Sequence, residues 1–163
     1  MKPIDIRNKV VRKWNVEVSN NTIRRAKALV AKNIDGSWKE QFKRIYDYAH
    51  EIIRSNPGST AKVKVEENNG EPTFIRLYIY LKACKDSFNS CRPIIGLDGC
   101  FLKGKYGSEL LVAIGIDAND QIMPIAWVVV EVENKETWTW FMDLLIDDLG
   151  GPQILGLCTF ISD

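Results

Sequence analysis

Hydrophobic residues in the first third of the chain recur at helical spacing, whereas later ones alternate or run together as in strands. The first pattern predicts three helices, over residues 3–14, 21–34 and 37–55. Ser19 or Asn20 can cap the second helix, and Ser37 with Glu40 forms a capping-box pattern at the third. The Asn-Pro-Gly sequence at 56–58 ends this third helix.

The rest of the chain predicts strands. Residues 60–65 and 73–81 alternate and are joined by a turn-rich segment, which indicates a hairpin. Three apolar runs with short turns then predict an antiparallel meander, followed by a helix and a last strand. The middle run is apolar on both faces and should be central, whereas Pro124 suggests that the third run lies at an edge. These five elements are expected at 92–103, 109–117, 122–132, 134–150 and 153–163.

The order of elements predicts an α/β (α+β) protein, with an N-terminal helical region followed by a β-β-β-α-β domain. We expect a helix-turn-helix-like DNA-binding region at 1–55, a hairpin and connector at 56–91, and the second domain at 92–163. No apolar run is long enough to span a membrane, and neither a membrane partner nor a zinc finger is expected.

Charge is distributed unevenly between the two halves. Residues 1–65 carry 15 Lys and Arg against 6 Asp and Glu, whereas residues 66–163 carry 7 against 15. A basic segment can hold a polyanion such as DNA. Candidate DNA contacts on the second helix are Arg24, Arg25, Lys27 and Lys32, although basic helices of this kind are also common as plain solvated helices.

The segment "IIGLDGCFLK" has the composition of a buried strand, yet it contains Asp98. An isolated buried carboxylate is costly unless it is paired or binds a metal. A crossover helix could return the last strand parallel to this one and bring Asp163 near Asp98. Two carboxylates repel unless a cation lies between them, and Mg²⁺ prefers oxygen ligands. The sequence therefore predicts a metal site suited to phosphoryl transfer.

The segment from "RPIIGLDGCFLKGKYGSELLVAIGID" through "ENKETWTWFMDLLIDDLG", and the closing "TFISD", resemble plant Mutator-like element (MULE) transposases. The resemblance implies an RNase H-like catalytic domain that cuts and joins DNA with an Asp–Asp–Glu triad. Asp98 and Asp163 match the two aspartates, as catalytic residues and as ligands of Mg²⁺ or Mn²⁺. It also implies a nuclear protein whose partner is the DNA of the element's terminal repeats. Full-length transposase is a further expected partner, for a chain that acts as its repressor.

The family's glutamate lies downstream of its second aspartate, whereas this chain ends at Asp163. We therefore expect a truncated transposase that is inactive alone. One alternative is a non-catalytic DNA-binding regulator or repressor, and another is a gene-model fragment that does not accumulate. Other acids are expected to be solvated or to lie at turns, namely Glu109, Asp117, Glu131, Glu133, Asp143, Asp147 and Asp148.

Overall fold

The computed structural model describes residues 2–35, 42–68, 70–103 and 107–162 of the 163-residue chain. The chain divides into two compact units, Met1–Arg44 and Ile45–Asp163. The first unit contains helices α1 (Pro3–Trp14) and α2 (Asn20–Asp35), which contact each other. Both helices were predicted, but the capping-box pattern at Ser37 and Glu40 lies outside the described residues.

Local hydrogen bonds explain why α1 and α2 are separate helices. Asn15 adopts the left-handed conformation, with φ of 50°, and its N–H donates to the Val11 carbonyl at 2.9 Å, which ends α1. The Ser19 hydroxyl then accepts a hydrogen bond from the Thr22 N–H at 3.1 Å, as an N-cap does. The predicted cap at Ser19 is confirmed, and the side chain of Ile23 is buried.

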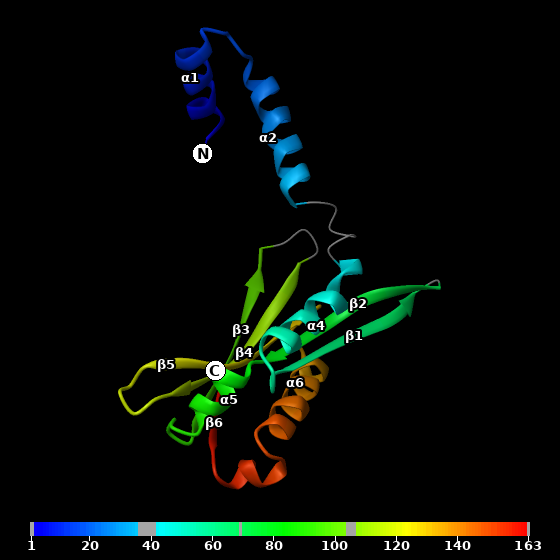
Figure 1. Ribbon diagram of the computed structural model, residues 1–163, viewed down its shortest axis with the longest axis vertical. Helices are drawn as coiled ribbons and strands as arrows, with labels where there is room; N and C mark the ends of the chain where they lie inside the picture. The colour runs from blue at the N-terminus through cyan, green and yellow to red at the C-terminus, as the bar shows by residue number, and fades with distance from the viewer. Residues whose placement is uncertain (1, 36–41, 69, 104–106, 163) are drawn as a thin grey trace. The chain divides into compact units, whose positions relative to one another are not determined.

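The second unit is built on one mixed six-stranded sheet, shown in Figure 1. Along the chain it contains α4 (Ile45–Ser55), β1 (Thr60–Asn68), β2 (Glu71–Tyr80), α5 (Lys82–Phe88), β3 (Ile94–Leu102), β4 (Ser108–Ile116), β5 (Ile122–Val130), α6 (Lys135–Asp148), the 3₁₀ helix η1 (Pro152–Gly156) and β6 (Thr159–Ile161). The sheet order is β1-β2-β5-β4-β3-β6. All pairs are antiparallel except β3 with β6, which are parallel.

The order of the sheet confirms three expectations. The β1–β2 hairpin and the β3–β4–β5 meander are present, and α6 carries the chain across to β6 beside β3. The α/β class is therefore correct. Two elements differ from prediction: α5 was not expected, and residues 152–156 form η1, which leaves a last strand of only three residues.

The prediction that β5 is an edge strand was wrong, because β5 lies between β2 and β4. Pro124 is accommodated for two reasons. The β4–β5 register shifts between Ala113 and Ile114, and Pro124 lies opposite Ile114 at this irregularity. In addition, β2 pairs with β5 only at 127–129. Proline is tolerated at bulges and at positions where a strand lacks a neighbour, and Pro124 meets both conditions.

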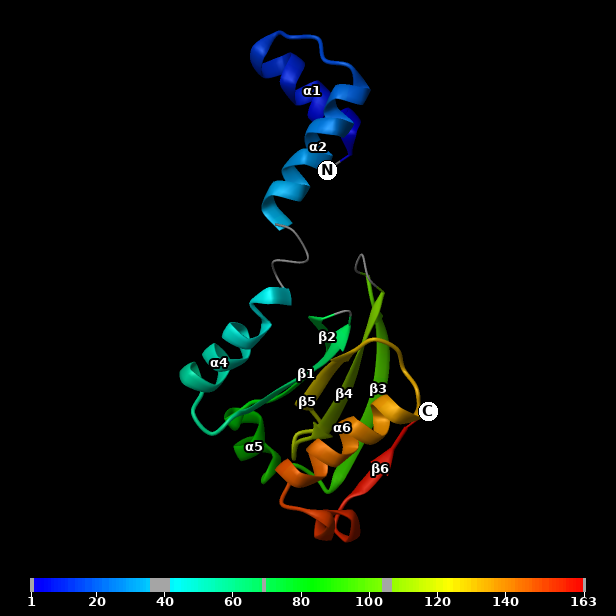
Figure 2. The same ribbon diagram turned by 90° about the vertical axis from the view of Figure 1, so that its right-hand side faces the viewer.

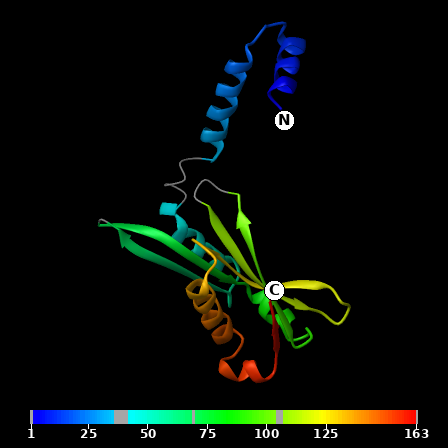
Figure 3. The same cartoon turned by 180° about the vertical axis from the view of Figure 1, so that it is seen from behind.

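Helix α6 covers one face of the sheet and α4 packs against β1 on the other side, as Figures 2 and 3 show. Phe141 and Leu145 are fully buried on α6, and the Tyr78 ring lies 6.0 Å from the Phe141 ring. The apolar side of α6 therefore packs against the sheet, with Phe141 beside Tyr78 of β2. The core contains Tyr78, Tyr80, Ile95, Leu111, Ala113, Ile125, Ala126, Val128, Val130, Phe141 and Leu145.

Candidate functional site

Asp98 lies in the middle of β3, opposite Val112 of β4. Its side chain is exposed, so the expectation of a buried carboxylate was wrong. The reason is that β6 pairs with β3 only from Ile94 to Gly96. Beyond Gly96 the strand has a described partner on one side only, and Phe101 is 82% exposed. The Oδ1 atom of Asp98 accepts a hydrogen bond from the Gly99 N–H at 2.8 Å.

Asp163, the second predicted ligand, lies outside the described residues. The described part of β6 runs parallel to β3 and its last pair joins Ile161 to Gly96, two residues before Asp98. The approach of Asp163 to Asp98 stays a prediction.

The exposed Asp98 carboxylate has the oxygen chemistry that Mg²⁺ and Mn²⁺ accept. Within the described ranges, no three His, Cys, Asp or Glu side chains are grouped so that they could hold a metal ion. Asp98 is thus a suitable ligand, which would hold such a cation only together with further oxygen ligands. The four cysteines, all described, are free thiols.

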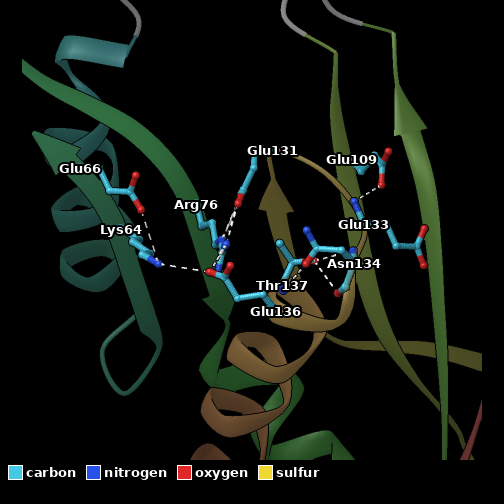
Figure 4. Close-up of polar contacts among 9 residues, drawn as sticks. All are labelled: Lys64, Glu66, Arg76, Glu109, Glu131, Glu133, Asn134, Glu136 and Thr137. Atoms are coloured by element: carbon cyan, nitrogen blue, oxygen red, sulfur yellow. Dashed lines mark hydrogen bonds and ion pairs between the residues drawn. The ribbon is translucent and has the colours of Figure 1, made fainter. Parts of the chain in front are cut away.

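Glu109 and Glu133 lie beside β3 on the face covered by α6, as Figure 4 shows. Glu109, expected at a turn, belongs to β4 and is only 9% exposed. Its Oε2 accepts a hydrogen bond from the Glu133 N–H. The Glu133 carboxylate accepts one from Trp138 Nε1 at 2.9 Å and lies against Gly99. Residues 98 and 99 of a strand point to opposite faces, so Glu133 is not on the face of Asp98.

Arg76 of β2 is a buried cation that was not predicted from the sequence. It faces the N-terminal end of α6, and its side chain is 2% exposed. Its Nε and Nη2 donate to both carboxylate oxygens of Glu131, and Nη2 also donates to Glu136 at 2.8 Å. These hydrogen bonds hold the pKa of the Glu131 carboxyl below its ordinary value. The sequence does contain a sign that Arg76 is buried. Residues 76, 78 and 80 of a strand share one face, so Arg76 lies on the same face as two tyrosines of the core.

Asp148, expected to be solvated, joins four segments. Its carboxylate accepts hydrogen bonds from Thr60 Oγ1 at 2.7 Å, Tyr78 Oη at 3.0 Å and Lys85 Nζ at 2.7 Å. Burial, and secondly the charge of Asp148, raise the pKa of the Tyr78 hydroxyl. Lys85 also lies 5.1 Å from the Tyr80 ring. The cluster binds the hairpin and α5 to the C-terminal end of α6, which is a structural role.

The predicted DNA-contacting residues lie on α2. The side chains of Arg24, Arg25 and Lys27 are exposed, whereas the side chain of Ile23 on the same helix is buried. Lys32 falls within the bounds of α2, but its side chain lies outside the described part of the structure. Contact with DNA stays a prediction.

Comparison with known proteins supports one relationship. Residues 94–154 match the family model of the MULE transposase domain. This segment runs from the start of β3 into η1, so it includes the meander, α6 and Asp98. The match supports a relation to Mutator-like transposases. No curated protein and no solved structure matches the chain.

The helices also bear on the expectation that no segment spans a membrane. None of the described helices combines the length and apolar character needed to cross a bilayer.

Proposed function

We propose that residues 92–163 form part of an RNase H-like catalytic domain of a plant-type Mutator-like transposase, and that Asp98 is its first metal ligand. The observation that carries this proposal is the coincidence of the family match with an exposed carboxylate in the middle of β3. The parallel pairing of β6 with β3 also supports the proposal. Asp163, the second ligand in this proposal, follows the last residue of β6 by two positions.

In this proposal Asp98 and Asp163 hold Mg²⁺ or Mn²⁺ for cleavage and joining of DNA at the element's ends. Bound divalent cations would supply electrostatic stabilisation to the phosphate under attack. The role of Asp98 is to present a fixed oxygen ligand, and the hydrogen bond from Gly99 to Oδ1 restricts its rotation. The site is expected to act in the nucleus on terminal-repeat DNA, in contact with full-length transposase.

The 163-residue polypeptide is not expected to cleave DNA alone, because no third acid is grouped with Asp98 among its described residues. A cleavage assay with terminal-repeat DNA and Mg²⁺ or Mn²⁺ tests this, with Asp98→Asn as the reference. Cleavage that Asp98→Asn abolishes would support the metal-ligand role but refute inactivity. Mn²⁺ binding that is equal in wild type and Asp98→Asn would refute the metal-ligand role.

A second candidate function is DNA binding without catalysis, as a regulator or repressor derived from a transposase. It is favoured by the separate compact unit Met1–Arg44, whose helix α2 carries exposed Arg24, Arg25 and Lys27. Phosphate contacts make such binding strongly dependent on salt. DNA affinity that does not change with salt would exclude this function.

A further inference from the structure

We propose that Glu133 is a positioning residue for Asp98 and acts through Gly99. The inference rests on the proposed metal-ligand role of Asp98, and it assigns Glu133 a function in the same site. Its starting point is an unusually close approach. A Cβ atom added to Gly99 would lie 2.6 Å from Oε2 and 2.9 Å from Cδ of Glu133. The Glu133 carboxylate therefore fills the space that a side chain would take at this position of β3.

Two neighbours fix Glu133 in this place. Trp138 of α6 donates its indole N–H to Oε1 at 2.9 Å. The backbone N–H of Glu133 donates to the carboxylate of Glu109, whose side chain is largely buried in β4. Glu133 is exposed as a residue, yet both of its ends are fixed by hydrogen bonds. Its carboxylate is bound by Trp138 of α6, and its backbone N–H is bound by Glu109 of β4. Figure 4 shows Glu133 extending from the Glu109 contact toward β3.

Gly99 connects this carboxylate to Asp98. The two residues are adjacent, so their substituents point to opposite faces of the sheet. The N–H of Gly99 donates to Asp98 Oδ1 at 2.8 Å, and on the other face the Glu133 carboxylate occupies the position where a Cβ of residue 99 would lie. A carboxylate fixed on the α6 face therefore restrains the peptide unit that holds one oxygen of Asp98.

The local structure of β3 makes such a restraint useful. Past Gly96 the described strand pairs only with β4, and glycine is the residue with the greatest backbone freedom. Without Glu133, Gly99 would have neither a side chain nor a second strand to hold it. Residues that orient a metal ligand commonly change metal affinity about 10–100-fold when they are removed.

The test uses the full chain with four variants: Glu133→Ala, Gly99→Ala, the two combined, and Glu133→Gln. In Gly99→Ala the added methyl meets the flexible end of Glu133, so the carboxylate should move and the fold should survive. Glu133→Gln keeps an oxygen acceptor for Trp138 and a side chain of the same size. Asp143→Ala removes an exposed carboxylate from α6 and is the matched control.

Two readouts are measured on each variant whose thermal unfolding shows it folded. The first is the amide proton shift of Gly99, with Asp98→Ala, which has no side-chain acceptor, as the reference for a broken hydrogen bond. The second is Mn²⁺ affinity. We expect Glu133→Ala and Gly99→Ala each to move the amide signal of residue 99 toward its position in Asp98→Ala and to weaken Mn²⁺ binding about tenfold. The combined variant should be no worse than either, because both changes remove the same restraint. Glu133→Gln and Asp143→Ala should resemble wild type.

An unchanged Gly99 amide in folded Glu133→Ala would overturn the positioning role. Equal losses in Asp143→Ala would do so too, because they would indicate a general charge effect. If wild type binds no Mn²⁺ through Asp98, the proposed function fails, whereas the amide shift still decides whether Glu133 restrains Gly99.

Discussion

The guanidinium of Arg76 binds both carboxylate oxygens of Glu131 although β2 and the residue after β5 are far apart in sequence. Arg76 is 2% exposed and Glu131 is 40% exposed. Nη1 of Arg76 is buried and has no hydrogen-bond partner among the described residues, while the Trp140 ring lies 5.8 Å from Cζ. A buried cation of this kind depends on its carboxylate, since losing one partner leaves the charge uncompensated.

Glu131→Gln should therefore destabilise the protein by about 2 kcal/mol in urea unfolding. This is less than the roughly 3–5 kcal/mol typical of breaking a fully buried ion pair, because Glu136 still pairs with Arg76. Arg76→Met combined with Glu131→Gln should lose less than the sum of the two single changes. The exposed ion pair of Glu51 with Arg54 on α4 is the matched control, and Glu51→Gln should have little effect. Equal losses in the two Glu→Gln variants would contradict the buried role of Arg76.

The same pair predicts a dependence of stability on acid pH. The pKa of Glu131 is lowered in the folded state, so its contribution is fully present above its ordinary value of 4.5 and is lost as pH falls through the lowered pKa. Thermal unfolding of wild type should therefore show a steeper fall in Tm below that pH than Glu131→Gln shows. Parallel curves for the two proteins would argue against this contribution.

Asp148 should be the most sensitive residue at the C-terminal end of α6. Asp148→Ala removes the acceptor of the buried Tyr78 hydroxyl and the carboxylate partner of Lys85, whose ammonium then keeps only the Thr60 hydroxyl. We therefore expect a loss of about 2–3 kcal/mol in urea unfolding. Tyr78→Phe removes a single hydrogen bond and should cost about 1 kcal/mol. Asp147→Ala, at the adjacent exposed position of α6, is the control. A loss in Asp147→Ala as large as in Asp148→Ala would show that the effect is not specific to this cluster.

Tyr78 also predicts behaviour at high pH. Because its pKa is raised in the folded state, its stabilising contribution is present below the ordinary value of 10.0 and is lost as pH rises above it. Phenolate absorbance from Tyr78 should therefore develop together with alkaline unfolding, followed by circular dichroism. The comparison is with Tyr78→Phe, and a phenolate signal that Tyr78→Phe removes while the protein is still folded would contradict the assignment.

Local patterns predicted most of the fold because hairpins, meanders and the start of α6 are set by nearby residues. Asn134, for example, was expected at the start of α6, and its side chain accepts the Thr137 N–H at 2.9 Å. The exposure of Asp98 was not predictable in this way, because it depends on how far β6 runs beside β3. The sequence composition of β3 gives no measure of that length.

The candidate site was predicted only where a single residue carried the signal. Asp98 was identified as an acid in an apolar strand, which the structure places on β3. The contact of Glu133 with Gly99 joins the β5–α6 connection to β3, and no local pattern links them. Arg76 and Asp148 were missed for the same reason, since their partners lie on other elements of the sheet unit.

The basic residues of α2 give the last prediction, which concerns DNA binding by the full chain. Arg24, Arg25 and Lys27 are exposed, so changing all three to alanine should leave the buried side of α2 at Ile23 intact. If these residues bind phosphates, the variant should bind DNA more weakly, and the slope of log K against log salt should fall by about 0.9 for each phosphate that is no longer neutralised. Arg54→Ala on α4, which removes one exposed cation, is the control for charge alone. Fluorescence anisotropy at several salt concentrations measures both quantities, and a slope equal to that of wild type would show that α2 does not bind the phosphates.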